Sequence, residues 1–120
     1  MASFQTREEP DGLVVTITDP AALNDFRTSN FRDTLYETIQ PLQGPRLALD
    51  LTVVDYLSSS GVALLVGLKR RVEAQSGKLV VCGAQPIILD LLRMMHLTQY
   101  FTFAGDEREA LVLLRPVPTA

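Results

Sequence analysis

Three consecutive serines, Ser58–Ser60, and the glycine that follows them are the residues of this chain best placed for chemistry. They stand where an amphipathic pattern begins, so they should form the first turn of a helix, where several backbone N–H groups lack a partner. A partner protein could distinguish a modified hydroxyl at that position from an unmodified one. The residue types alone fit equally well a structural role, in which Ser58 caps the helix and Ser59 and Ser60 fill its first turn.

A helical projection from Gly61 separates two faces of this predicted helix. The positions expected to face the core are Gly61, Leu64, Leu65, Leu68 and Val72. Val62, Ala63 and Val66 point outward, with Arg70 in a later turn. The same projection puts Ser59 on the outward side and turns Ser60 away. We therefore predict an accessible Ser59 beside an apolar patch, which suits docking of a protein partner or weak self-association, so that the chain would be a monomer or weak dimer.

Catalysis has little support in the residues. The single histidine, His96, ends a predicted helix and is expected to cap or pack. The single cysteine, Cys82, fits a buried strand position and cannot form an internal disulfide. There is no Gly-x-Ser-x-Gly turn around a nucleophile and no phosphate loop ending in Gly-Lys-Ser/Thr. We predict no enzyme activity, no metal and no cofactor.

Composition narrows the partners and the location. The chain has 120 residues and a net charge of −3 without a basic block, so nucleic acid is not an expected partner. Its longest apolar run, Gly61–Leu68, is far shorter than the ~20 residues that span a bilayer. The first residues lack the apolar core of a signal peptide. We expect one cytoplasmic domain over residues 1–120, with no membrane contact and with residues 1–3 and 115–120 frayed.

Apolar runs bounded by turn residues predict an α/β fold with a mixed sheet of four or five strands and about four helices. The expected strands are Phe4–Glu9, Leu13–Thr18, Arg46–Leu51, Lys78–Gly83 and Tyr100–Phe103. The expected helices run from Pro20 to before Pro41, from the serines to Ser76-Gly77, over Pro86–His96 and over Glu107–Leu114. The first two strands form a hairpin. Arg46–Leu51 should be the central strand, parallel to Lys78–Gly83 because a helix connects them.

Two of these helices carry specific expectations about burial. The helix after Pro20 should carry Leu23, Phe26, Phe31, Leu35 and Ile39. In the helix that begins at Pro86, the side chains expected to face the sheet are Ile87, Leu91, Met94 and Met95. Asp90 and Arg93 of the same helix should face water.

The order of elements and one segment resemble the STAS domain, named for sulphate transporters and anti-sigma factor antagonists. The segment is the strand Leu47–Leu51 followed by Val54-Asp55-Tyr56-Leu57-Ser58-Ser59-Ser60-Gly61, which looks like the family's strand and Asp-Ser-Ser-Gly or Asp-Ser-Thr-Gly turn. The strand within Gly77–Gly83 matches as well. The resemblance covers nearly the whole chain and implies a single STAS-like domain.

In bacterial anti-sigma factor antagonists, the serine just after that aspartate is phosphorylated. The matching position here is Ser59, with Asp55, Ser58, Ser60 and Gly61 as neighbours. The resemblance implies partner switching: the unphosphorylated protein binds an anti-sigma factor that is also a serine kinase, and a serine phosphatase resets it. Val62, Ala63, Val66 and Arg70 are the residues expected to contact the partner.

Two departures from the family pattern leave alternatives open. Ser58 replaces the aspartate, and Thr18–Leu23 replaces a Gly-x-Leu-Asp type turn, so Asp19, Asp25 or Asp55 would have to supply the missing charge. One alternative is a STAS scaffold or ligand-sensing module that is never phosphorylated and works in a larger signalling assembly. Another is a response-regulator receiver phosphorylated on Asp50, although no acid pair that could hold Mg²⁺ follows the first strand.

Overall fold

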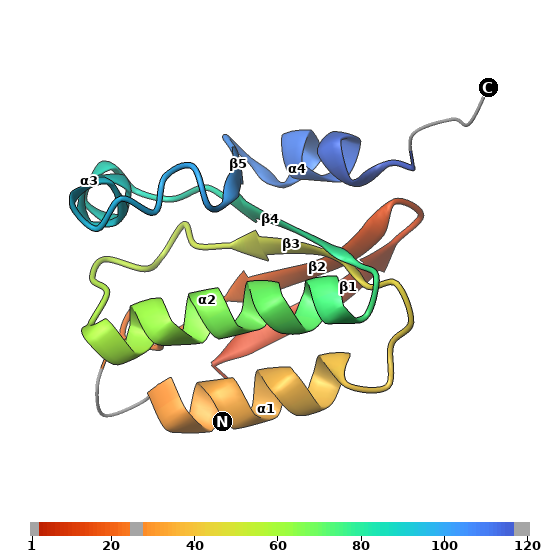
Figure 1. The fold of residues 1–120 in the computed structure, drawn as a ribbon, viewed down its shortest axis with the longest axis horizontal. Helices are drawn as coiled ribbons and strands as arrows, with labels where there is room; N and C mark the ends of the chain where they lie inside the picture. Colours follow the sequence, from red (N-terminus) through yellow and green to blue (C-terminus); the bar gives the residue numbers. More distant parts are fainter. Residues whose placement is uncertain (1–2, 25–27, 117–120) are drawn as a thin grey trace.

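The computed structural model describes residues 3–24 and 28–116. Within them, five strands form one mixed sheet, and four helices pack around it (Figure 1). The strands are β1 (Phe4–Glu9), β2 (Gly12–Ile17), β3 (Arg46–Asp50), β4 (Lys78–Cys82) and β5 (Thr102–Ala104). The helices are α1 (Thr28–Ile39), α2 (Ser59–Ala74), α3 (Pro86–Met94) and α4 (Glu107–Leu114). The predicted α/β class and mixed sheet are confirmed.

The sheet follows the order β1-β2-β3-β4-β5, so β3 is its central strand, as predicted. β1 and β2 form an antiparallel hairpin, whereas β2, β3, β4 and β5 pair in parallel. Parallel neighbours need a long crossover connection, and in this chain each crossover contains a helix. The carboxyl ends of β2, β3 and β4 therefore lie at one end of the molecule, together with the segments that follow them (Figure 1).

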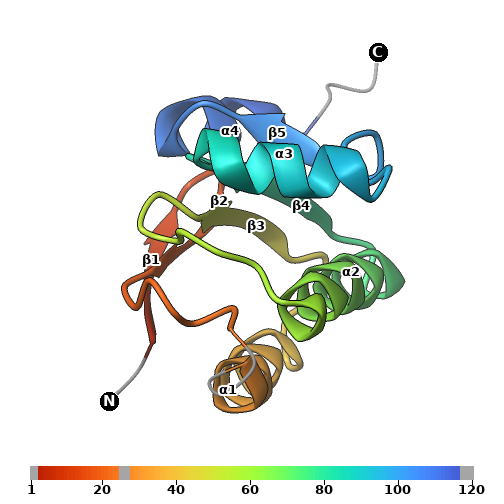
Figure 2. The same ribbon diagram turned by 90° about the vertical axis from the view of Figure 1, so that its left-hand side faces the viewer.

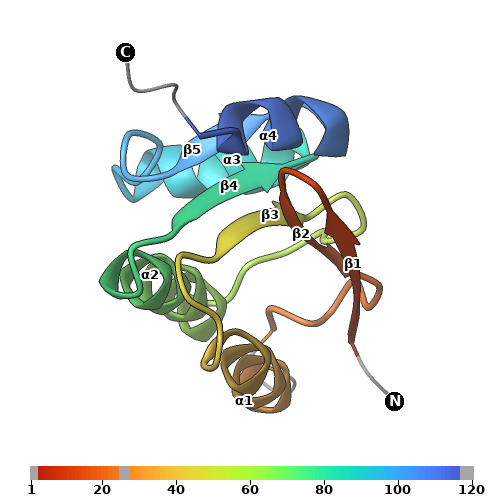
Figure 3. The same cartoon turned by 90° about the vertical axis from the view of Figure 1, so that its right-hand side faces the viewer.

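The two faces of the sheet are covered by different helices. α1 and α2 lie on one face, α4 lies on the other, and α3 lies near the end at which β3 stops (Figures 2 and 3). Side chains alternate along β3, so Leu47 and Leu49 join a large cluster with α1 and α2, while Ala48 faces α4. The cluster beneath α4 is small and consists of Val14, Ala48, Val80, Cys82, Ala110 and Leu114.

The first helix begins later than predicted. Asp19–Asn24 forms a series of turns, in which the Asp19 carboxylate accepts a hydrogen bond from the Ala21 N–H at 2.9 Å. A side chain that bonds its own backbone in this way competes with helix formation. Leu23 is fully buried, but it reaches the core from a turn rather than from a helix. Phe26 and Asp25 lie outside the described residues.

The buried face of α3 is also different from the prediction. Ile88 and Leu92 are buried, and Leu91 is partly buried, whereas Met94 is 76% exposed. Ile87 and Met95 are about half exposed. The sequence offers apolar doublets, Ile87-Ile88 and Leu91-Leu92, and either member of each could face inward. The docking of the helix against the sheet selects the second member. Asp90 and Arg93 form an exposed ion pair, as expected.

At the ends of the described chain, where we predict fraying, Ser3 and Arg115 make contacts with the rest of the fold. The Ser3 carbonyl accepts the Thr18 N–H at 2.8 Å, and Arg115 pairs with Asp11 at 3.0 Å. The remaining terminal residues expected to fray include 1–2 and 117–120, which lie outside the described residues. Among the helices described, none has the length and apolar character needed to cross a membrane.

Candidate functional site

The three serines lie at the start of α2. Ser58 is the N-cap residue, with an extended backbone (φ −79°, ψ 171°), and its Oγ accepts the Gly61 N–H at 3.0 Å. Its carbonyl accepts the Val62 N–H at 2.9 Å. The Ser58 side chain therefore satisfies one of the N–H groups that a helix start leaves unpaired, that of Gly61, while the Val62 N–H makes the first regular hydrogen bond of the helix. The predicted cap is confirmed.

Ser58 also joins α2 to the segment Asp19–Asn24. Its backbone N–H and its hydroxyl both donate to the Leu23 carbonyl, at 3.1 and 3.0 Å. The Ser60 hydroxyl lies 3.0 Å from the Ser58 hydroxyl. Ser58 is only 6% exposed, so these are buried contacts between segments that lie 35 residues apart. No sequence pattern predicted the contact between Ser58 and the Leu23 carbonyl.

Gly61 makes this close approach possible. A Cβ atom at this position would lie 2.2 Å from the Leu23 carbonyl oxygen and 3.0 Å from the Leu23 Cβ. These distances are shorter than a van der Waals contact, and the first involves backbone that cannot move aside. A glycine is therefore required wherever this segment crosses the helix start so closely.

Ser59 is exposed at the first helical position, as the projection predicted. Within residues 3–24 and 28–116 its hydroxyl makes no hydrogen bond. The neighbouring Ser60 is exposed too, although its hydroxyl contacts Ser58. Of the three serines, Ser59 thus presents its hydroxyl to solvent most freely.

The outward stripe of α2 contains Ser59, Ala63, Val66 and Arg70 but not Val62. Val62 is 7% exposed and belongs to the core, so its predicted exposure is wrong. One flank of α2 is covered by the chain beyond α3: Lys69, seven residues after Val62 and so on the same flank, lies 5.0 Å from the Tyr100 ring. Val66 is half-buried, which leaves Ala63 and Arg70 as the exposed members beside Ser59.

Further exposed apolar side chains belong to segments at the same end of the molecule. In the connection from β3 to α2, Tyr56 is 50% exposed and Val53 is exposed as well. α3, this connection and the start of α2 all lie together at that end (Figures 1 and 2). The large apolar side chains exposed on α3 and at its C-cap are Ile87, Met94 and Met95. Exposed apolar side chains gathered in this way are typical of a surface that binds protein.

Comparison with known proteins places this geometry in a family. The family model described as STAS domain matches residues 3–110. The chain belongs to the STAS domain family. A curated relative, the anti-sigma F factor antagonist of Paenibacillus polymyxa, is 29% identical over 94 residues, which cover 78% of this chain and 80% of the relative.

Solved structures agree on the fold. A STAS domain protein described as an anti-sigma-factor antagonist, from Planctomyces limnophilus, superposes with a TM-score of 0.83 at 20% identity, covering 94% of this chain and 98% of the other. The anti-sigma factor antagonist SpoIIAA in its unphosphorylated form superposes with a TM-score of 0.75 at 18% identity, covering 97% and 99%. At these identities the similarity establishes the STAS fold.

The acids that could replace the missing aspartate of this STAS domain are placed in different ways. Asp55 is exposed on the β3–α2 connection and forms no ion pair within the described ranges. Asp19 lies in the segment that contacts Ser58, where its carboxylate accepts the Ala21 N–H. Asp25 lies outside the described residues. Ser58, which the motif resemblance matches to an aspartate, offers a neutral hydroxyl.

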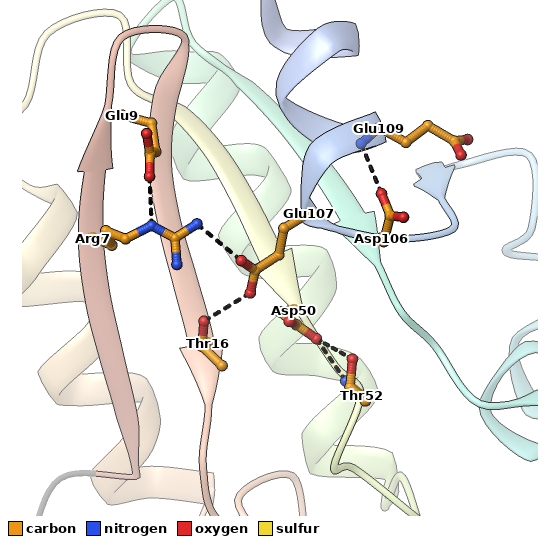
Figure 4. Close-up of polar contacts among 8 residues, drawn as sticks. All are labelled: Arg7, Glu9, Thr16, Asp50, Thr52, Asp106, Glu107 and Glu109. Carbon is orange, nitrogen blue, oxygen red and sulfur yellow. Dashed lines mark hydrogen bonds and ion pairs between the residues drawn. The ribbon is translucent and has the colours of Figure 1, made fainter.

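A second polar group lies on the opposite face of the STAS domain, under the start of α4 (Figure 4). The Glu107 carboxylate accepts hydrogen bonds from Arg7 at 2.9 Å and from Thr16 at 3.1 Å. Asp50 accepts hydrogen bonds from the backbone N–H and the hydroxyl of Thr52. Arg7, Asp50, Thr52 and Glu107 line an open cavity of about 800 Å³.

This group affects the pKa values of two side chains, Asp50 and Cys82. Burial alone would raise the pKa of Asp50, but hydrogen bonds to its carboxylate, from Glu107 when that carboxyl carries a proton and from the N–H and hydroxyl of Thr52, outweigh it and hold that pKa below its usual value. Burial, reinforced by Asp50, Glu107 and Asp106, raises the pKa of the Cys82 thiol to about 12. Cys82 is fully buried, which agrees with its predicted role as a small core residue. A response-regulator receiver needs a group of acids that holds Mg²⁺. Among the described residues, no group of three or more His, Cys, Asp or Glu is arranged to hold a metal ion.

Proposed function

We propose that this STAS domain is an anti-sigma factor antagonist controlled by phosphorylation of Ser59. In the unphosphorylated state it binds an anti-sigma factor that is also a serine kinase, and this binding frees a sigma factor. Phosphorylation ends the complex, and a serine phosphatase restores the binding form. The protein acts in the cytoplasm by binding, without a cofactor of its own.

The observation that carries this proposal is the exposed Ser59 hydroxyl at the first position of a capped helix. A kinase must reach the hydroxyl without unfolding its surroundings, and Ser59 meets that condition. The curated relative and the SpoIIAA structure support the class of protein, because both are anti-sigma factor antagonists.

The docking surface that we propose combines the outward stripe of α2 with the β3–α2 connection. Its members are Ser59, Ala63, Val66, Arg70 and Tyr56. Arg70 is exposed and forms no ion pair in the part of the chain that is described, so it is available to an acidic group of the partner. Val62, buried in the core, contributes by supporting this surface rather than by touching the partner.

Phosphorylation would act on this surface directly. A phosphate adds about −1.5 to −2 charges, which oppose burial in an apolar interface. The fold would persist, because the N-terminus of a helix carries a partial positive charge that tolerates an anion. The switch therefore works by blocking contact and requires no refolding of α2.

The test uses Ser59→Ala, Ser59→Glu and the wild-type protein with the cognate anti-sigma factor kinase and ATP. Intact mass and peptide mapping should find one phosphate, on Ser59, in the wild type and none in either variant. Titration calorimetry should give wild-type affinity for Ser59→Ala and at least about a tenfold loss for Ser59→Glu, or about 1.4 kcal/mol. Ser29→Ala, an exposed serine on α1, is the matched control and should behave as wild type.

One observation favours the second candidate, a STAS scaffold or ligand-sensing module that is not phosphorylated. The family's acidic position is held by Ser58, whose hydroxyl is turned inward to the Leu23 carbonyl. If both Ser59 variants bound the partner as tightly as wild type and no phosphate reached Ser59, switching would be excluded and the scaffold preferred.

A further inference from the structure

Ser58 holds two segments together with a single buried side chain. Its hydroxyl donates to the Leu23 carbonyl at 3.0 Å and at the same time accepts the Gly61 N–H at 3.0 Å. The donated bond reaches across 35 residues of sequence, while the accepted bond stays within the first turn of α2. A hydroxyl is suited to this position because it donates one hydrogen and accepts with its lone pairs.

The geometry points to Ser58 as a positioning residue that locks the segment Asp19–Asn24 against the start of α2. The donor is the essential feature. An ionised aspartate could still cap Gly61, but it has no hydrogen to give to Leu23 and would set a carboxylate against a carbonyl oxygen. The serine in the family's acidic position therefore has a function of its own in this chain.

The segment itself explains why a lock is needed. Ala22 and Leu23 are fully buried, yet the adjacent Asn24 Oδ1 is buried without a hydrogen-bond partner among the described residues. A buried acceptor without a partner disfavours the arrangement that contains it. The two hydrogen bonds that Ser58 gives to the Leu23 carbonyl act in the opposite direction at the neighbouring residue.

The consequence for docking rests on the proposed function. Thr18 and Pro20 are exposed at the start of this segment, and its end is fixed to the residue before Ser59. A locked segment would present a second rigid surface beside Ser59 to the anti-sigma factor kinase. The lock itself can be measured on the protein alone, so its test does not depend on that function.

The experiment is amide hydrogen exchange, followed by NMR on the whole chain, for Ser58→Asp, Ser58→Ala and Ser58→Thr. The reporters of the lock are the amides of Ala22 and Asn24, which donate within the segment at 3.0 Å each. The Gly61 amide reports the helix cap. Amides of the central strand β3 report global stability. Ser59→Ala, which removes the adjacent hydroxyl, is the matched control.

In Ser58→Asp we expect the Ala22 and Asn24 amides to exchange about tenfold faster relative to β3, with Gly61 still protected, as expected for the loss of one hydrogen bond. Ser58→Ala should speed the exchange of all three amides, those of Ala22, Asn24 and Gly61. In Ser58→Thr and in Ser59→Ala the three amides should exchange at the wild-type rate. The proposal is overturned if the segment amides in Ser58→Asp stay at the wild-type rate, or if they change only by the factor seen in β3.

The binding consequence is measured separately by calorimetry with the anti-sigma factor kinase. Ser58→Asp should bind about tenfold more weakly than Ser58→Thr, which keeps the donor. Equal affinities, together with the expected exchange result, would overturn the link to docking and leave the lock standing. Failure of the Ser59 variants to switch would instead overturn the proposed function without affecting the exchange result.

Discussion

The two faces of the sheet hold their helices in different ways. α2 buries Leu64, Leu65 and Leu68 in the large cluster that it shares with α1. α4 buries only Ala110 and Leu114, and its first turn is held by the polar contacts of Glu107. Because the free energy of burial grows with the apolar area removed from water, α2 is held far more firmly than α4.

This difference matters for function because Ser59 lies on the firmly held helix. A phosphate placed there meets a rigid surface and can act only by changing what that surface binds. Asp50 and Cys82 lie beneath the weakly held helix, where local opening exposes them more readily. The STAS domain thus separates the rigid face on which we propose docking from a looser face covered by α4.

Truncation of one leucine on each face should give the largest difference. Leu68→Ala removes a fully buried side chain from the large cluster and should lower the free energy of unfolding by about 4 kcal/mol. Leu114→Ala, near the end of α4, should cost about 2 kcal/mol because the helix end can relax into the space. Urea denaturation measures both. Equal losses would mean that the two faces are equally firm.

A methyl group at Gly61 should have the next largest effect. Gly61→Ala forces a contact with the Leu23 backbone and should cost about 3 kcal/mol, because overpacking against backbone cannot be relieved by a side chain. The control is Gly105→Ala, just before α4, where the nearest atom to a new Cβ is the Glu109 carboxylate at 3.4 Å. That variant should unfold within about 0.5 kcal/mol of wild type. A similar loss in both would contradict the tight packing at Gly61.

Labelling of Cys82 sharpens the comparison by reporting local opening of α4. With its pKa raised to about 12 and its side chain buried, the thiol should react with a disulfide reagent only after α4 detaches. Leu114→Ala should speed native-state labelling about thirtyfold, which corresponds to about 2 kcal/mol. Val72→Ala, in the large cluster, should leave the labelling rate near wild type. Acceleration by Val72→Ala alone would show that Cys82 reacts through global unfolding.

The smallest effect concerns acid pH. The pKa of Asp50 is lowered in the folded state, so this carboxylate stabilises the fold above its unfolded pKa of about 3.9 and loses that contribution as pH falls through the folded value. Between pH 5 and 3, Asp50→Asn should therefore lose less stability than wild type. The difference should stay below about 1 kcal/mol because solvent screens a partly exposed carboxylate.

The measurement is denaturant unfolding at several pH values, with Asp55→Asn as the control on the exposed β3–α2 connection. The control should follow the wild-type curve. If Asp50→Asn and wild type showed the same dependence of stability on pH, Asp50 would not contribute to the polar contacts beneath α4.

Signals that act over a few residues determined much of this STAS domain. Turn residues between apolar runs predicted the hairpin, the central β3 and its parallel partner β4. The helix start at Ser58 and the bounds of α4 also follow from local capping and turn residues, because such residues satisfy backbone groups beside them in sequence. The exposure of Ser59 could be projected from the helical period alone.

Contacts between distant segments decided the rest. Val62 is buried in the large cluster, on a flank of α2 where Lys69 lies over Tyr100, and α3 buries Ile88 rather than Ile87 because of how it docks. The meeting of Ser58 with the Leu23 carbonyl, like that of Glu107 with Arg7, joins residues far apart in sequence. The helical period fixes which side chains share a face, but only the packed neighbours decide whether water reaches it.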